Sequence, residues 1–390
     1  MKLAATVLLS ISAFASAVAA ERCDNKALGE KIKLFGEVSL KGTDGTNGPE
    51  SFAHDSAGVT YFSNGDGSVR KVTDDASGAN EVYFQSQPDL TPEERATCGT
   101  SVLNEFTCGR PLGILFDSQD NLYVADAYRG ILRAPRSDPS QVEVLASKYA
   151  DDSPIKFANS MLLDEEANVL YFTTSSDQYY RLQFVSVVVD NTPDGKLIKL
   201  DLNTGELEVL VDDLAFANGI QYWSGRDGNG TRKDPAGIII NETNARRLRR
   251  YYLTGERAGQ NDVFVQDIGG YADNLKSWGN DKYLVGLFTE TQDWVTAIQE
   301  HEEIQEFMLQ QDPLSVISKF DSLGLVKVVS ATGRVLETWI DLTGANFGQV
   351  AEAEVVGDEL YLGSVVRPHY GVMKLDDLID VDAAYIGCEN

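Results

Sequence analysis

A short apolar strand pattern recurs along the chain, and a tyrosine stands inside each copy. Each copy is preceded, at a similar spacing, by one residue that marks the start of the unit. A turn rich in Asp, Asn or Gly lies between this residue and the tyrosine strand. The clear copies are 59–62, 121–124, 169–172, 282–285 and 359–362, and the upstream positions are Glu50, Pro111, Asn159, Asp273 and Gln349. Apolar runs separated by such turns predict strand–turn–strand units.

A further unit begins at Asn218, and its second strand, 237–240, comes late. We interpret the polar segment 224–231 between them as an insertion in the hairpin. It contains the sequon Asn229-Gly230-Thr231, which predicts glycosylation of Asn229 on a surface loop. A second sequon, at Asn241, follows the strand directly and is the weaker candidate for glycosylation.

With this unit the pattern gives six repeats, which predict an all-β protein with the fold of a six-bladed β-propeller. Helical periodicity appears in the segments 176–189 and 293–320, and Pro313 is expected to break the second. We interpret both segments as helical insertions over one face of the ring. The alternative is that they pack on its side.

The first 20 residues resemble a secretory signal peptide. Lys2 precedes an apolar stretch, 3–14, and the Ala-rich segment 17–20 offers a cleavage site. The prediction is a signal peptide over 1–20 and one propeller domain over 21–390, secreted or in the lumen of the secretory pathway. An uncleaved membrane anchor is the alternative. No later stretch is long enough to span a bilayer, so no stable membrane insertion is expected after cleavage.

The net charge of −27 argues against nucleic acid and anionic lipid surfaces as partners. The four cysteines allow three pairings. Cys98 and Cys108 flank a short loop and are expected to bridge it. Cys23 and Cys388 lie at the two ends of the mature chain, so their pairing is expected if the ring closes. None of the cysteines has zinc-finger spacing, which argues against metal binding by them.

Four polar residues share one phase of the repeat, and they stand on four of the six units: Glu50, Asn159, Asn218 and Asp273. If the repeats close into a ring, these side chains meet at its centre. Two carboxylates and two amide oxygens are ligands that Ca²⁺ prefers, and soft ligands are absent. A turn is the alternative for any single Asn-Gly or Asp-Asn.

A cation at this point would polarise an ester or lactone carbonyl. Asp273 would then act as general base or as nucleophile, and Glu50 would serve as a ligand. A general-base role for one of the three histidines, His54, His301 and His369, is the weaker alternative. The residues expected to line the pocket are Tyr128, Trp294, Arg367, His369 and Tyr370.

Three motifs, 108–113 (Cys-Gly-Arg-Pro-Leu-Gly), 123–128 (Tyr-Val-Ala-Asp-Ala-Tyr) and 214–219 (Leu-Ala-Phe-Ala-Asn-Gly), resemble the strictosidine synthase-like family. The resemblance covers nearly all of the mature chain. That family is similar to paraoxonases and gluconolactonases, which are six-bladed calcium-dependent hydrolases. The resemblance implies that the four residues in phase ligate calcium and that Asn274 is a further ligand.

The chain departs from these relatives at the residues that define their reactions. Ala345 stands where strictosidine synthases have a glutamate that takes a proton from an amine. The histidine pair of serum paraoxonase aligns with Leu112 and, roughly, Ala127. We therefore expect a calcium-dependent hydrolase of esters or lactones, an arylesterase or lactonase. The alternatives are an enzyme that condenses an amine with an aldehyde and a non-catalytic propeller stabilised by calcium.

Overall fold

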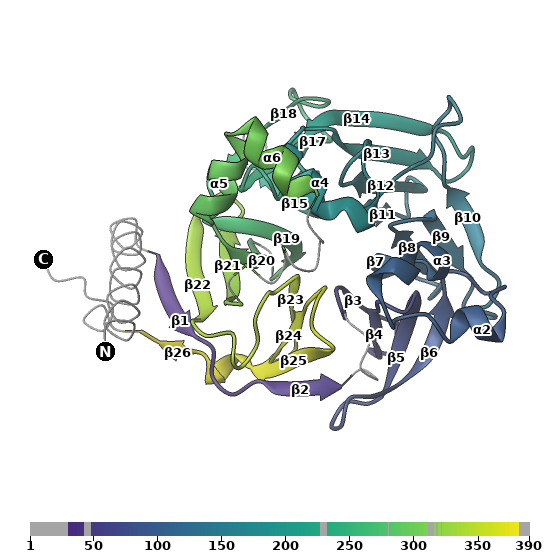
Figure 1. The fold of residues 1–390 in the computed structure, drawn as a ribbon, viewed down its shortest axis with the longest axis horizontal. Helices are drawn as coiled ribbons and strands as arrows, with labels where there is room; N and C mark the ends of the chain where they lie inside the picture. The colour runs from purple at the N-terminus through teal and green to yellow at the C-terminus, as the bar shows by residue number, and fades with distance from the viewer. Residues whose placement is uncertain are drawn as a thin grey trace, which may run out of the picture.

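The strands of the chain form six sheets arranged radially around a central axis (Figure 1). The computed structural model describes residues 30–42, 48–226, 232–279, 281–310, 316, 319–320 and 322–381. The predicted six-bladed β-propeller is confirmed. The predictions for the signal peptide 1–20, Cys23, Cys388, Asn229 and Pro313 lie outside the described residues.

Each blade is built around four antiparallel strands, and the first strands of neighbouring blades contact one another around the axis. Blade one contains β3 (Phe52–His54), β4 (Thr60–Ser63), β5 (Ser68–Asp74) and β6 (Ala79–Gln85). Blade two contains β7 (Pro111–Phe116), β8 (Leu122–Asp126), β9 (Gly130–Ala134) and β10 (Glu143–Ala146). Blade three contains β11 (Ala158–Asp164), β12 (Val169–Thr174), β13 (Gly195–Asp201) and β14 (Leu207–Leu214).

The remaining blades follow the same order. Blade four contains β15 (Ala217–Arg226), β16 (Arg232–Glu242), β17 (Arg247–Tyr252) and β18 (Asn261–Val265). Blade five contains β19 (Gly270–Ser277), β20 (Lys282–Glu290), β21 (Gly324–Ser330) and β22 (Val335–Asp341). Blade six contains β23 (Glu352–Val356), β24 (Glu359–Gly363) and β25 (His369–Lys374) from the end of the chain. In blade four, β15 continues to Arg226, inside the predicted insertion 224–231, and β16 begins directly after it at Arg232.

Strands from the two ends of the chain close the ring. β2 (Ser39–Gly42) pairs with β25 and completes blade six as its outermost strand. β1 (Lys31–Leu34) pairs in parallel with β22 on the outer edge of blade five. β26 (Ile379–Asp380) then pairs with β1, and the short helix η3 (Leu375–Asp377) connects it to β25.

The tyrosine of the sequence repeat explains how the blades pack. It lies on the second strand of its blade and is at most 8% exposed, within an apolar cluster shared with a neighbouring blade. The five copies are Tyr61, Tyr123, Tyr171, Tyr283 and Tyr361. The aromatic side chain at each of these contacts buries apolar surface between two blades, which stabilises the closed propeller.

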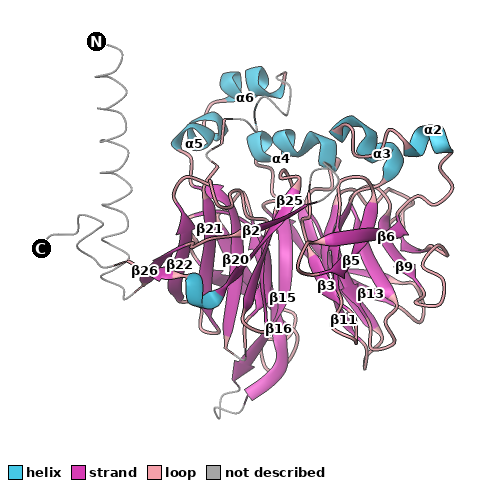
Figure 2. Cartoon of the chain, turned by 90° about the horizontal axis from the view of Figure 1, so that it is seen from below, coloured by secondary structure: helices cyan, strands magenta, loops and turns pink. Residues whose placement is uncertain are grey.

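Helices gather on one face of the propeller (Figure 2). The insertion between β12 and β13 contains η2 (Arg181–Gln183) and α4 (Phe184–Asp190), and the insertion after β20 contains α5 (Asp293–Gln299) and α6 (Glu302–Leu309). α4 packs against α5 and Val316 through a small apolar cluster. The insertions therefore cover one face of the ring, as predicted, and not its side.

The connection between blades one and two adds three short helices to the same face, which the sequence pattern did not predict. They are α2 (Pro92–Arg95), η1 (Val102–Asn104) and α3 (Glu105–Cys108). In the part of the chain that the structure describes, no helix has the length and apolar character needed to cross a membrane.

Candidate active site

A cavity of about 330 Å³ opens on the face that carries the helices. Glu50, Asn159, Asn218 and Asp273, which come from blades one, three, four and five, all line it. Each of the four is at most 7% exposed. The structure thus brings together the residues that share one phase of the sequence repeat.

Local irregularities in the inner strands turn three of these side chains toward the cavity. The pairing register shifts between Ala158 and Met161, between Ala217 and Ile220, and between Ala272 and Leu275. Asn159, Asn218 and Asp273 lie inside these three shifts. A β-bulge bends its strand and redirects a side chain, which is why residues of an otherwise regular strand can converge on one point.

Glycine permits the close approach of the inner strands at this point. A Cβ atom on Gly219 would lie 2.6 Å from Cα of Asn274 and 2.9 Å from the carbonyl oxygen of Asp273. No side chain fits at that distance. The residue after Asn218 is therefore a glycine because the backbone of the next blade occupies the space.

The aromatic residues two positions upstream of the convergent residues form part of the cavity wall: Phe157, Phe216 and Tyr271. Phe157 and Phe216 adopt positive φ angles of 52° and 60°. Bulky residues rarely adopt this conformation, which costs on the order of 1–3 kcal/mol per residue. The sequence analysis did not predict this aromatic wall. The signal for it was an aromatic residue followed by alanine and then Asn or Asp, which occurs at all three positions.

Three buried side-chain oxygens in the cavity have no hydrogen-bond partner among the described residues: Oε2 of Glu50, Oδ1 of Asn159 and Oδ1 of Asn218. The amide nitrogens of the two asparagines are held in place, by Oγ of Ser175 at 2.9 Å and Oγ1 of Thr243 at 3.2 Å. These bonds leave both amide oxygens for another partner. A buried oxygen without a partner costs about 1–3 kcal/mol of stability. Three of them in one cavity therefore indicate a bound species, such as a cation, that these oxygens coordinate.

The donor set fits a hard cation. In the described chain, no group of three or more His, Cys, Asp or Glu side chains is placed to hold a metal ion. A cation in this cavity would therefore depend on the amide oxygens of Asn159 and Asn218 together with the carboxylates of Glu50 and Asp273. An all-oxygen set that mixes amides and carboxylates suits Ca²⁺ better than zinc or copper.

The two carboxyl groups are costly to ionise without such a cation. Burial, followed by the nearby charge of Asp273, raises the pKa of Glu50 to about 8. Burial also raises the pKa of Asp273 to about 7. A divalent cation held by both carboxylates would offset these effects and lower the two pKa values, because an opposite charge favours the ionised form.

Asn274, which the family resemblance suggests as a further ligand, lies beside Glu50. Its Nδ2 donates to Oε1 of Glu50 at 3.3 Å, and its backbone nitrogen donates to the carbonyl of Ala351 at 2.9 Å. Asn274 thus orients the Glu50 carboxylate. Its role as a ligand stays a prediction.

A second group of charges stands in the wall of the cavity. Nη1 of Arg181 donates to both carboxylate oxygens of Glu105, at 2.9 and 3.2 Å, and both residues line the cavity. Nε of Arg110 lies 3.6 Å from the same carboxylate, and the hydroxyl of Tyr128 donates to it at 3.2 Å. Our sequence reasoning missed Arg181 and Glu105, because both come from the helical segments outside the strand repeat.

The five residues predicted to line the pocket are not among those that line this cavity. Tyr128 lies behind the lining, where it bonds to Glu105 and packs against the cluster that contains Leu112. Trp294 packs behind the lining residue Phe320 at a ring distance of 4.9 Å. Tyr370 is 1% exposed and packs between blades six and one. Val365 and Val366 line the cavity where Arg367 and His369 were expected, because the chain has already turned into β25 at His369.

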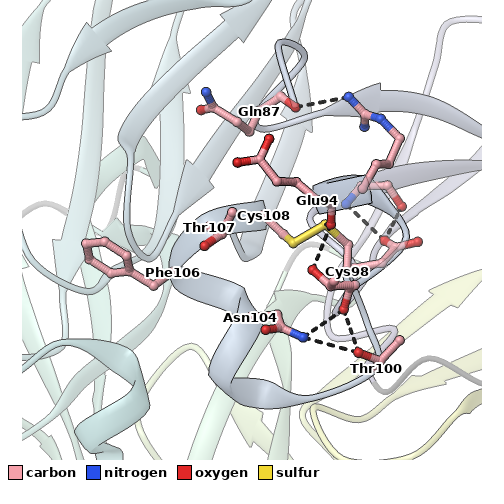
Figure 3. The surroundings of a disulfide bond; sticks show 12 residues. Gln87, Glu94, Cys98, Thr100, Asn104, Phe106, Thr107 and Cys108 are labelled. Carbon is pink, nitrogen blue, oxygen red and sulfur yellow. Dashed lines mark hydrogen bonds between the residues drawn. A yellow bond between two sulfur atoms is a disulfide. The ribbon is translucent and has the colours of Figure 1, made fainter. Parts of the chain in front are cut away.

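The other predictions for side chains have mixed outcomes. The Cys98–Cys108 disulfide is confirmed (Figure 3). Glycosylation of Asn241 is wrong: this side chain is fully buried, and its Nδ2 donates to the carbonyl of Asp273 at 2.6 Å. His54 lies away from the cavity lining, with Nε2 3.5 Å from the carboxylate of Glu354.

Comparisons with known proteins point to one family. A family model described as strictosidine synthase matches residues 159–256. The chain is 30% identical over 355 residues to the protein strictosidine synthase-like 10 of Arabidopsis thaliana, which covers 88% of this chain and 89% of the relative. It is 29% identical over 330 residues to the human adipocyte plasma membrane-associated protein, with 82% of this chain and 74% of the relative covered.

Two solved structures superimpose on most of the chain. A gluconolactonase from Xanthomonas campestris superimposes with a TM-score of 0.55 and 13% identity, over 91% of this chain and 93% of that one. A calcium-binding protein, regucalcin, from Agrobacterium tumefaciens gives a TM-score of 0.56 and 14% identity, over 90% and 96%. At this identity the likeness concerns the fold.

Proposed function

Since the chain belongs to the strictosidine synthase-like family, we propose that it is a calcium-dependent hydrolase of esters or lactones. The observation that carries the proposal is the group of unpartnered oxygens on Glu50, Asn159 and Asn218 beside the buried carboxyl of Asp273. The names of the two propellers of similar fold, a gluconolactonase and a calcium-binding regucalcin, agree with it.

Glu50, Asn159, Asn218 and Asp273 would hold the calcium ion, and Asn274 is proposed as an additional ligand. When bound, Ca²⁺ supplies a Lewis acid that polarises a carbonyl and stabilises negative charge on its oxygen. The amide nitrogens of the two asparagines are fixed by Ser175 and Thr243, so the ligand oxygens are oriented before the ion binds.

Asp273 is the proposed catalytic residue. Its carboxylate would accept a proton from a water molecule as that water attacks the carbonyl carbon of the substrate. The C–O bond to the leaving alkoxide then breaks, and the proton passes to that oxygen. Attack by Asp273 itself as a nucleophile is the alternative, with an anhydride to the enzyme that water hydrolyses.

The wall of the cavity would exclude water from the reacting groups. Leu112, Phe157 and Phe216 surround the polar floor, and Phe184 of α4 and Phe320 cover it from the inserted segments. Such walls strengthen electrostatic interactions inside the site and favour substrates with an apolar part.

Condensation of an amine with an aldehyde is the less supported reaction. It needs a base where Ala345 stands, and Ala345 is exposed on the turn after β22. A non-catalytic propeller with a structural calcium ion would use the same oxygens, and it differs from the hydrolase in showing no turnover.

The test is hydrolysis of a panel of aryl esters and lactones by the purified protein, before and after chelation. We expect activity that chelation removes and added calcium restores, and that Asp273→Asn removes without a loss of fold. Hydrolysis unaffected by both treatments would rule out the mechanism. Product formation from an amine and an aldehyde, without ester hydrolysis, would favour the condensing enzyme.

We also propose that the protein enters the secretory pathway through its first 20 residues. The disulfide between Cys98 and Cys108 supports an oxidising compartment. Mass spectrometry of the mature protein from a eukaryotic host would locate its first residue. A mature chain that retains residues 1–20 would favour the membrane anchor.

A further inference from the structure

Arg181 carries a charge on the cavity wall that the proposed reaction does not use. It is the first residue of η2, its side chain is 12% exposed, and it lines the same cavity as the proposed calcium ligands. Glu105 partners one of its nitrogens, and the remaining donors of the guanidinium lie against largely apolar walls, where a polar group without a partner is costly. Its position therefore calls for a functional explanation.

The hydrogen bonds of Arg181 occupy only part of its guanidinium. Both bonds to Glu105 use Nη1, and no other side-chain hydrogen bond joins Arg181 to a described residue. Glu105 is also shared, because Arg110 and Tyr128 approach the same carboxylate. Nη2 and Nε of Arg181 are thus available to a ligand in the cavity.

The charges around the loaded cavity do not balance. Three carboxylates, on Glu50, Asp273 and Glu105, face two guanidiniums, on Arg110 and Arg181, and the proposed divalent cation. One positive charge is in excess. Beneath the floor, outside the lining, Lys276 lies 3.3 Å from Glu352 and 4.0 Å from Glu354, so the excess concerns only the groups counted above.

The rest of the cavity is apolar. The side chains that surround the charged groups are Leu112, Phe157, Phe184, Phe216, Phe288 and Phe320. A cavity of about 330 Å³ with such walls accommodates an organic molecule of moderate size. Its occupant should combine an apolar body with one negative charge.

We propose that Arg181 is a specificity-determining residue, and that the preferred substrates are esters or lactones that carry a carboxylate beside an apolar group. The planar guanidinium offers two parallel donors that match the geometry of a carboxylate. The inference rests on the proposed function of the same cavity, since it names the substrate class of that hydrolase.

The kinetic test compares two substrates of matched size, phenyl butyrate and the phenyl monoester of succinic acid. The second carries a carboxylate at the end of its acyl chain. We expect the calcium-loaded enzyme to prefer the monoester. Arg181→Met should lower kcat/KM for the monoester by about 10- to 100-fold, mainly through KM, as expected for a charge-assisted hydrogen bond. Hydrolysis of phenyl butyrate should change by less than about threefold, which is small beside that range.

Two further variants separate specificity from structure. Arg181→Lys keeps the charge and should retain part of the preference for the monoester. Glu105→Gln combined with Arg181→Met removes both partners of the ion pair, so it tests the loss of Arg181 without leaving Glu105 unpaired. Equal losses on both substrates in all three variants would overturn the proposal, because they indicate a structural role.

A binding measurement keeps this inference distinct from the hydrolase itself. 4-Phenylbutyrate has the charge and the apolar ring but no ester bond. Calorimetry should show that the calcium-loaded protein binds it and that Arg181→Met weakens this binding at least tenfold, the lower end of the range for such a bond. Binding that depends on Arg181 in a protein without esterase activity would support the inference and refute the hydrolase. Hydrolysis of esters combined with binding that is unchanged in Arg181→Met would do the reverse.

Discussion

The side-chain nitrogen Nδ2 of Asn274 donates a hydrogen bond to Oε1 of Glu50 at 3.3 Å, although 224 positions separate the two residues in the sequence. This bond joins blade five to the segment that precedes blade one, across the centre of the ring. It leaves Oε2 of Glu50 without a partner among the described residues. The first prediction concerns that oxygen.

Replacing Glu50 with glutamine should weaken calcium binding at least tenfold, because one of the two anionic ligands is lost. Calorimetric titration of the chelated protein with calcium measures this change. Glu208→Gln is the matched control, since that carboxylate lies on the exposed strand β14 and pairs with Lys199 at 3.1 Å. Equal calcium affinity in the two variants would contradict the assignment of Glu50.

Asp273→Asn preserves the shape of the side chain and an oxygen for the cation but removes the base. We expect kcat for ester hydrolysis to fall by about 10²- to 10⁴-fold, the usual range for a general acid–base group. Because Asp273 is also one of the two anionic ligands, the assay uses saturating calcium, and the circular dichroism spectrum should match that of the unchanged protein. A variant that keeps its activity would show that another group accepts the proton.

The metal-free protein should lose stability as the pH rises from about 4 to about 8. The pKa values of Glu50 and Asp273 are raised to about 8 and about 7, so the folded state holds protons that the unfolded chain has released. That contribution is complete below the unfolded pKa and is lost as the pH passes the folded value. Calcium should reverse the trend, because it binds the ionised forms.

Thermal melts at pH 5, 6, 7 and 8, with chelator and with calcium, would measure this dependence. The double variant Glu50→Gln with Asp273→Asn provides the control for all other titrating groups. The stability of the chelated protein relative to this variant should fall as the pH rises, because glutamine and asparagine resemble the protonated carboxyls. A difference that is constant over this range would contradict the raised pKa values.

Opening the disulfide should affect the cavity as well as stability. The loop that Cys98 and Cys108 close contributes Gly99, Thr100, Ser101 and Val102 to the lining. Asn104 donates to Oγ1 of Thr100 within this loop (Figure 3) and to the carbonyl of Thr97 just before it. Replacing both cysteines with serine should lower the free energy of unfolding by about 2–3 kcal/mol, from the entropy of a short loop.

The same double variant should raise KM for aryl esters, since one wall of the cavity becomes less ordered. Urea denaturation and steady-state kinetics measure the two effects separately. An unchanged KM in a destabilised protein would indicate that the loop does not contact the substrate.

Gly219→Ala tests the close packing at the centre of the ring. The added Cβ would lie 2.6 Å from Cα of Asn274, so the backbone of blade five has to move. We expect a loss of about 1–3 kcal/mol in the free energy of unfolding, typical of overpacking, together with weaker calcium binding. Gly42→Ala is the control, because no atom of the described residues lies within 4 Å of its added Cβ. Equal effects of the two substitutions would exclude a packing cause.

The sequence predicted the fold and the floor of the cavity because both follow from a local repeat. The tyrosine on each second strand indicates the contact between blades, and a residue such as Asn159 is tied to its blade by a fixed spacing. Once the number of blades is known, closure of the ring places these residues together. The bulges around Asn159, Asn218 and Asp273 refine their direction without changing their phase.

The walls of the cavity could not be predicted in the same way. Arg181, Glu105 and Phe320 belong to inserted segments, whose position depends on how helices pack over the ring and not on the repeat. Trp294 is a large aromatic residue of the same insertions, yet it lies behind the wall. The positive φ of Phe216 is likewise invisible in the sequence, because bulky residues rarely adopt it and no residue type signals it.

The pairing of β2 with β25 has a consequence for biosynthesis. The ribosome makes residues 39–42 long before the strand that they join, 369–374, has been translated. The outermost strand of blade six, β2, must therefore wait for its partner during nearly the whole of synthesis. A chain that stops short of β25 should expose the free edge of blade six to chaperones and proteases. Such an unpaired edge is a feature by which quality control in the cell would distinguish incomplete molecules from finished ones.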